Sequence, residues 1–283
     1  MKLTQSQALA LGRLKRQRLI EIVKRTLEFD HDDQYPNVYL YSSPGLGKTH
    51  IVKELLDRNN VTHYVVCGNN SLFAFGIQLA VIAYHNLFEP VVVLVDDCDE
   101  LLKDTIGCNI MKNVLEGDKK YVYEKALTTQ MLNLSELQLA AVEYFKQEGK
   151  MGFSIPTDKM KFIFTSNIKL PTDDFVQKIR EKKSGSTMSV MIHRNAIRSR
   201  CTVADFELTK EEHWGWLADA VQTTEILGNT TSLEKNEYLD FLWSYWDNLS
   251  ERSLRTIHKM KDIKRKYPER YLELWTIDLL KSN

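Results

Sequence analysis

The sequence has no apolar run of the roughly 18–20 residues that a helix needs to cross a bilayer. The nearest candidate, residues 72–84, is too short and is interrupted by Gln78. The beginning of the chain, MKLTQSQALALGRLKRQRL, also lacks the apolar segment of a secretory signal. We therefore expect a cytoplasmic protein with no membrane partner.

The sequence also has few cysteines and no net charge. The four cysteines, Cys67, Cys98, Cys108 and Cys201, form no C-x-x-C pair and have no nearby histidine at zinc-binding spacing. This favours reduced thiols over a disulfide framework or a metal site. The 38 Lys and Arg residues balance 38 Asp and Glu residues. That balance excludes a globally basic coat for nucleic acid and leaves local basic patches open.

The 283 residues do contain enough apolar side chains, 43% of the total, for a buried core. Patterns typical of strands alternate with patterns typical of helices, which predicts an α/β fold with a parallel sheet flanked by helices. The expected strands are residues 38–41, 61–67, 91–95, 161–165 and 202–208. The third contains only Val and Leu without alternation, as expected of a strand covered on both faces.

The helical patterns frame this sheet. Residues 5–28 predict an amphipathic helix with a basic outer face. Beyond residue 208 only helical patterns follow, at 210–226, 234–246, 251–266 and 268–281. We therefore predict an α/β domain over residues 1–208 and a small all-helical domain over residues 209–283.

A phosphate-binding loop is predicted between the first strand and its helix. The segment from Ser42 to His50 reads Ser-Ser-Pro-Gly-Leu-Gly-Lys-Thr-His, the strand–loop–helix context that such a loop requires. Glycines let backbone N–H groups turn toward phosphate oxygens, and the helix presents its positive end. The consensus begins with Gly where this chain has Ser42, at the loop entrance. The candidate nucleotide-binding residues are Ser43, Pro44, Gly45, Leu46, Gly47, Lys48, Thr49 and His50.

Within this loop, Lys48 is expected to contact the β- and γ-phosphates, and the Thr49 hydroxyl to ligate Mg²⁺. The apolar strand at 91–95 leads into Asp96 and Asp97. At the carboxyl end of a parallel strand, Asp96 is placed to hold Mg²⁺ and Asp97 to polarise an attacking water. ATPases more often have Glu at the second position. A solvated acidic turn is the alternative, which the phosphate loop makes less favourable.

With both motifs present, the chain resembles the AAA+ ATPases from about residue 5 to residue 270. The resemblance implies a P-loop AAA+ fold with a five-stranded parallel sheet and a helical lid, ATP and Mg²⁺ as ligands, and ATP hydrolysis. Lys161–Asn167 resembles the sensor-1 strand, so that Asn167 would orient the water or the γ-phosphate. The segments Asp97–Glu100 and Asn109–Lys112 are similar to those of stand-alone AAA+ ATPases of tailed bacteriophages. This resemblance implies that the protein acts in the cytoplasm of a bacterial host.

Arginines complete the resemblance. Ser199-Arg-Cys201 is similar to the clamp-loader segment that carries an arginine finger, which makes Arg200, with Arg198 as the second choice, the residue that reaches a neighbouring subunit's ATP. The catalytic candidates are thus Lys48, Asp97, Asn167 and Arg200. Ser250 is a plausible N-cap of a helix that resembles sensor 2, in which either Arg252 or Arg255 would contact the phosphates.

Two segments are less specific. Residues 121–123 and 153–155 could pair as a hairpin carrying helix 135–149, in an insertion of about residues 118–158 that resembles those of the MoxR and replicative-helicase branches. Phe73 and Phe75 fall where ring ATPases have pore loops, and they are equally compatible with ordinary core aromatics.

The resemblance implies a ring-forming homo-oligomer, usually hexameric, that couples ATP hydrolysis to motion. Residues 178–200 contain seven basic side chains against one acid, which favours DNA or a replication protein as the partner. A MoxR-type protein remodeller is the first alternative. An ATP-binding subunit with little turnover is the second, because Asp97 is one methylene shorter than Glu.

Overall fold

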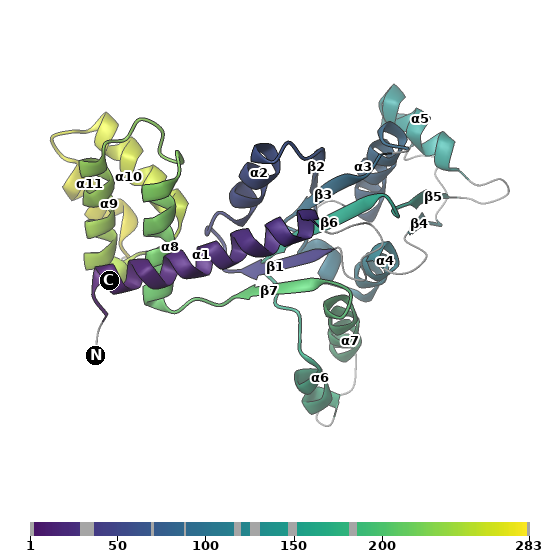
Figure 1. The fold of residues 1–283 in the computed structure, drawn as a ribbon, viewed down its shortest axis with the longest axis horizontal. Helices are drawn as coiled ribbons and strands as arrows, with labels where there is room; N and C mark the ends of the chain where they lie inside the picture. The colour runs from purple at the N-terminus through teal and green to yellow at the C-terminus, as the bar shows by residue number, and fades with distance from the viewer. Residues whose placement is uncertain are drawn as a thin grey trace. The chain divides into compact units, whose positions relative to one another are not determined.

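Five parallel strands form the central sheet, in the order β2-β3-β6-β1-β7, flanked by helices in the computed structural model (Figure 1). The strands are β1 (Val38–Ser42), β2 (His63–Cys67), β3 (Val91–Asp96), β6 (Met160–Ser166) and β7 (Thr202–Phe206). The predicted parallel α/β sheet is confirmed. Every residue of β6 is buried, and so are the five apolar residues of β3, which explains the absence of polar alternation in both strands.

The structure describes residues 3–28, 37–68, 71–87, 89–115, 120–124, 131–146, 152–180 and 186–281. The chain divides into two compact units. The helical unit comprises Met1–Glu21, Ser42–Ile51 and Phe206–Asn283, and the sheet unit comprises Ile22–Tyr41 and Val52–Asp205. A separate lid domain over residues 209–283 stays a prediction.

Helices of the sheet unit connect its strands along the chain. They are α3 (Leu72–His85), the 3₁₀ helix η1 (Glu100–Leu102), α4 (Thr105–Leu115), the 3₁₀ helix η2 (Met131–Asn133), α5 (Glu136–Phe145), α6 (Asp173–Arg180) and α7 (Ser186–Arg198), while α2 (Lys48–Arg58) runs from one unit into the other. Among them, α6 and α7 were not predicted. Ser71 starts α3 by accepting a hydrogen bond from the N–H of Ala74, which satisfies one of the helix's unpaired donors.

The predicted hairpin is present and belongs to the core. Strands β4 (Lys120–Tyr123) and β5 (Phe153–Pro156) pair antiparallel. Tyr121 is fully buried and packs its ring edge-on against Phe75, with centroids 5.9 Å apart. Phe73 packs in the same way against Phe153 at 6.4 Å. Both residues lie on α3 and pack against this core, Phe75 buried and Phe73 half-buried, which favours the alternative of ordinary core aromatics over a pore-loop role. Parts of the predicted insertion lie outside the described residues.

The helical unit contains the beginning of α1 (Gln5–Glu28), then α8 (Lys210–Thr223), α9 (Ser232–Tyr245), the 3₁₀ helix η3 (Trp246–Asn248), α10 (Leu254–Lys266) and α11 (Tyr271–Leu279). Thr209 and Thr231 begin α8 and α9 with complete capping boxes, in which the Thr side chain and a Glu three residues later satisfy each other's backbone donors.

Close packing joins α1 to α8. A Cβ added to Gly12 would lie 2.0 Å from the carbonyl carbon of Gly215, so the two backbones approach too closely for any side chain. One turn further along α1, Arg16 is only 7% exposed and donates to the buried carboxylate of Asp219 at 3.0 Å, and Arg13 donates to the same carboxylate at 2.8 Å. Arg13, Arg18, Lys24 and Arg25 of this helix are exposed, as the predicted basic outer face requires, whereas Arg16 faces α8 and its charge is paired there.

No helix within the described ranges is both long and apolar enough to span a membrane. All four cysteines are free thiols, with Cys67 exposed and the other three buried.

Candidate nucleotide-binding site

The predicted phosphate loop lies between β1 and α2. Gly45 and Gly47 both have left-handed backbone conformations, with φ of 79° and 78°, which residues with a Cβ rarely adopt. The loop therefore depends on glycine for its shape. Thr49 and His50 follow on the first turn of α2, with Thr49 half-buried and His50 exposed.

Lys48 reaches across the loop to its beginning. Its side chain is buried, and its ammonium donates to the backbone carbonyl of Ser42 at 2.8 Å and to that of Ser43 at 3.4 Å. A buried ammonium must be hydrogen-bonded, and here backbone oxygens of the loop meet part of that need. The positive charge of Lys48 therefore lies inside the loop, where it would attract an anion.

Residues from the C-terminal part of the sequence pack against this loop and hydrogen-bond to it. A Cβ on Gly45 would lie 2.3 Å from the Cβ of Ser253, and one on Gly47 would lie 2.9 Å from a methyl carbon of Leu254. The N–H of Leu254 donates to the carbonyl of Gly45 at 3.1 Å, and the indole N–H of Trp216 donates to the carbonyl of Leu46 at 2.9 Å. These contacts were not predicted, because no local pattern marks residues that are 170 or more positions apart in the sequence.

The acidic turn after β3 is tied to the end of β6. The Thr165 hydroxyl donates to the carboxylate of Asp96 at 2.8 Å and accepts the backbone N–H of Asp97 at 3.1 Å. Asp97 has a left-handed backbone, φ 55°, a conformation that Asp tolerates better than most residues. Thr165 therefore orients one carboxylate and fixes the backbone of the next residue.

Asp99 makes a second connection between the same two strand ends. Its carboxylate accepts the Ser166 hydroxyl at 2.6 Å, the backbone N–H of Asn167 at 2.9 Å and the Asn167 side-chain amide at 3.3 Å. That amide also lies 3.4 Å from the carboxylate of Asp97. The structure thus brings Asn167 together with Asp97 and Asp99. Nothing in the sequence distinguished Thr165 or Asp99 as partners in this arrangement.

Cys98 contributes no charge to the acidic turn. Burial raises the pKa of its thiol well above its ordinary value, and the neighbouring Asp99 carboxylate acts in the same direction. The thiol is therefore neutral at physiological pH, and the negative charge of the turn comes from its carboxylates.

Three of the basic residues in segment 178–200 donate hydrogen bonds to backbone carbonyls. Arg194 donates to the carbonyl of Leu102 at 2.9 Å, and Arg198 to that of Leu170 at 3.2 Å. Arg200 is half-buried just after α7 and donates to the carbonyl of Ala196 at 2.5 Å. Lys182 and Lys183 lie outside the described residues.

The helix with the two sensor-2 candidates begins later than predicted. Ser253, rather than Ser250, is the N-cap of α10 and accepts the N–H of Thr256. Arg252 therefore precedes the helix, and its guanidinium donates to the backbone carbonyls of Trp246 and Asp247 at 2.7 and 3.1 Å. Arg252 and Arg255 therefore do not lie on the same helix.

Arg255 lies in the first turn of α10 and is exposed. No hydrogen bond joins its guanidinium to another residue in the described ranges. Its nearest acidic influence is Glu251, whose pKa is lowered by hydrogen bonds from Ser253 and Lys259 and by the charge of Arg255. Of the two candidates, Arg255 has the side chain that can reorient toward a ligand without breaking a contact.

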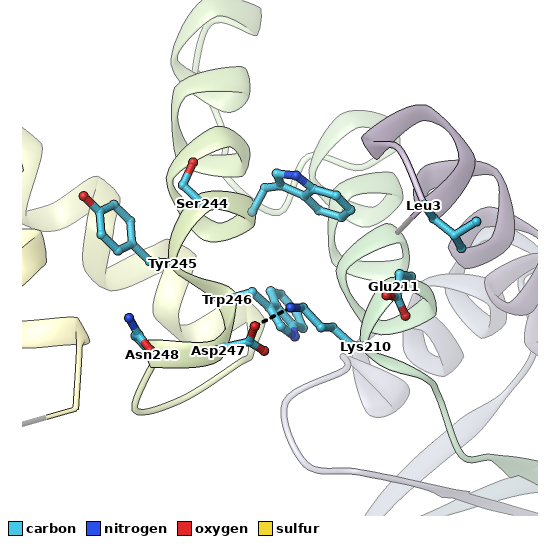
Figure 2. A pocket seen from close by; sticks show the side chains of 9 residues that line it. Leu3, Lys210, Glu211, Ser244, Tyr245, Trp246, Asp247 and Asn248 are labelled. Atoms are coloured by element: carbon cyan, nitrogen blue, oxygen red, sulfur yellow. Dashed lines mark hydrogen bonds and ion pairs between the residues drawn. The ribbon is translucent and has the colours of Figure 1, made fainter. Parts of the chain in front are cut away.

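A pocket of about 320 Å³ lies elsewhere in the helical unit, between the start of α8 and the end of α9 (Figure 2). Trp243 and Trp246 line it, and Lys210 donates to Asp247 at 2.6 Å beside the Trp246 ring. Among the described residues that line it, the one cation, Lys210, is paired with an acid, and Glu211 adds a further negative charge. Phosphate binding there is disfavoured, and no residue of the phosphate loop lines it.

The described residues contain no group of three or more His, Cys, Asp or Glu side chains that could hold a metal ion. A magnesium–nucleotide complex does not need such a group, since Mg²⁺ typically keeps several waters and takes one or two protein oxygens besides the phosphates. The oriented carboxylate of Asp96 fits that chemistry. The sequence matches no protein-family model and no curated protein.

Proposed function

We propose that the protein is an ATPase of the P-loop class with the AAA+ arrangement, which binds Mg-ATP on the loop at residues 43–50. The strand order is the observation that carries this proposal. β6, which ends beside Asn167, lies directly between β1, which leads into the loop, and β3, which ends in the acidic turn. Because the three strands are parallel, their carboxyl ends share one edge of the sheet, where ligands of such folds bind.

Each part has a chemical role in this proposal. The loop N–H groups and the start of α2 receive the phosphates, and Lys48 exchanges its carbonyl partners for phosphate oxygens. Thr49 and Asp96 would hold Mg²⁺, which neutralises charge on the phosphates when it is bound. Asp97, 3.4 Å from the amide of Asn167, accepts a proton from the attacking water while Asn167 orients that water. The helices after residue 209 act as the lid.

Replacing Asp97 tests hydrolysis separately from binding. Asp97→Asn is expected to leave Mg-ATP affinity nearly unchanged and to slow phosphate release at least about a hundredfold, because an amide cannot accept the proton. Both quantities are measurable by calorimetry and a phosphate-release assay. Glu100→Gln is the matched control, since Glu100 lies three residues away, is exposed and forms an ion pair with nearby Lys103.

Normal hydrolysis by Asp97→Asn protein contradicts the assignment of Asp97. Tight binding without phosphate release by the unaltered protein favours the alternative of a nucleotide-binding subunit with little turnover.

We further propose that hydrolysis acts on a nucleic-acid or replication-associated partner through a homo-oligomeric ring, as the AAA+ resemblance implies. Single-stranded DNA, duplex DNA or RNA is then expected to raise phosphate release at low salt, with steep loss as salt increases. Removing Lys178 and Arg180, the cations in the last turn of α6, is expected to reduce the slope of log affinity against log salt by about 1.4 to 1.8.

The matched control removes Arg265 and Lys266 from the last turn of α10, which changes the net charge equally at another place. A rate that no nucleic acid changes contradicts this part of the proposal and favours a MoxR-type protein remodeller.

A further inference from the structure

Two donors from the C-terminal helices hold consecutive carbonyls of the phosphate loop. The indole N–H of Trp216, on α8, reaches the carbonyl of Leu46 at 2.9 Å. The N–H of Leu254, the first residue of α10, reaches the carbonyl of Gly45 at 3.1 Å. All four residues belong to the helical unit, and Trp216 is fully buried.

These bonds determine which way the loop's peptide groups face. The structure contains no cis peptide bond among its described residues, and in a trans peptide the C=O and N–H groups point in opposite directions. Holding the carbonyls of Gly45 and Leu46 toward α8 and α10 therefore directs the N–H groups of Leu46 and Gly47 away from those helices. Inward-facing N–H groups in a row make an anion-binding concavity.

The glycine conformations leave the loop in need of such support. Gly45 and Gly47 have φ of 79° and 78°, but glycine has access to many other backbone conformations. Holding it in one conformation therefore costs more conformational entropy than for any other residue. A loop that had to order itself around a phosphate would bind more weakly by that cost.

We infer that Trp216 and the first N–H of α10 are positioning groups that hold the phosphate loop in its nucleotide-binding conformation before nucleotide arrives. This inference rests on the proposed function. In this inference, Trp216 orients the loop backbone without touching the nucleotide. The C-terminal helices then increase the affinity of the loop for nucleotide.

Trp216→Phe removes the indole donor and keeps an aromatic ring in the buried position, where Trp216 packs against Phe206 at 5.5 Å. The matched control is Trp214→Phe, because Trp214 lies on the same helix, is also buried and donates to the carbonyl of Leu239 at 3.3 Å. Calorimetry with Mg-ATP gives the affinity, and the thermal midpoint of unfolding gives the stability of each ligand-free protein.

Both variants are expected to lose similar stability. Only Trp216→Phe is expected to bind Mg-ATP more weakly, by about fivefold, the value of one hydrogen bond. Equal affinities of Trp216→Phe and unaltered protein overturn the inference and leave the proposed function intact. An unaltered protein that binds no Mg-ATP overturns both.

A second pair of variants serves if Trp216→Phe does not fold. Leu254→Pro removes the backbone N–H at the first helical position, where proline fits, and Ser253 before it is already extended (φ −149°, ψ 167°). Leu254→Ala loses the side chain and keeps the N–H. We expect Leu254→Pro to bind Mg-ATP about fivefold more weakly than Leu254→Ala. Equal binding by these two variants overturns the role of α10.

Discussion

Lys48→Ala protein is expected to bind Mg-ATP at least about a hundredfold more weakly than the unaltered protein and to release no phosphate above background. The Lys48 ammonium lies inside the loop, 2.8 Å from the carbonyl of Ser42, and in the proposed function it would exchange that partner for phosphate oxygens. Each hydrogen bond to a charged group contributes about 1.5–3 kcal/mol. Lys48→Ala removes the expected bonds to the β- and γ-phosphates together with the positive charge.

Lys53→Ala is the matched control for this experiment, because Lys53 lies on the same helix, α2, and outside the loop. Calorimetry with Mg-ATP measures both affinities, and the unfolding midpoint of ligand-free protein shows whether Lys48→Ala still folds. Unchanged affinity in a folded Lys48→Ala protein means that the loop is not the phosphate site, and the whole assignment of the nucleotide then fails.

The sheet was predictable because each strand is marked by residues that are adjacent in the sequence. Val91–Val95 of β3 is a continuous apolar run, as expected of a strand buried on both faces, and β6 contains the apolar run Phe162–Phe164. The glycines at 45 and 47 mark a turn between strand and helix. The acidic residues at 96 and 97 directly follow a strand, so their place at its carboxyl end also followed from the sequence.

Contacts over long sequence separations were not predictable. Arg16 looked like a residue of a solvent-facing stripe because its partner, Asp219, lies 203 positions away. The start of α10 was misplaced because both Ser250 and Ser253 suit an N-cap. Ser250 instead donates its hydroxyl to the carbonyl of Leu279, which a local pattern cannot reveal.

The same limit applies to the candidate site. Thr165, Asp99 and Trp216 orient predicted site residues, yet each acts through an element distant in sequence. Motifs identify groups that touch a ligand, since ligand chemistry restricts those residue types. The groups that orient them can be any donor or acceptor with the right position, so only the fold identifies them.

Arg200→Ala protein is expected to keep its affinity for Mg-ATP and to lose phosphate release by roughly 10³–10⁵-fold, the contribution of an arginine finger. The reason is that a finger stabilises charge that develops on a neighbouring subunit's γ-phosphate during the reaction. In the single chain Arg200 is half-buried and donates to the carbonyl of Ala196 at the end of α7. In the proposed ring, Arg200 would exchange that carbonyl for a phosphate oxygen of the neighbouring subunit.

Mixing gives the sharper test of this assignment. Lys48→Ala subunits keep Arg200 but do not bind nucleotide, whereas Arg200→Ala subunits bind nucleotide but lack the finger. A mixture is expected to recover part of the phosphate release, because some interfaces then combine an intact loop with an intact finger. Mass measurement with and without ATP establishes that mixed oligomers form.

Arg198→Ala distinguishes the second choice for the finger. The Arg198 guanidinium donates to the carbonyl of Leu170, so its removal is expected to lower the unfolding midpoint and to leave phosphate release per folded subunit nearly unchanged. Loss of turnover in Arg198→Ala with normal turnover in Arg200→Ala transfers the role to Arg198. Normal turnover in both variants means that hydrolysis is completed within one subunit, and a ring is then unnecessary for catalysis.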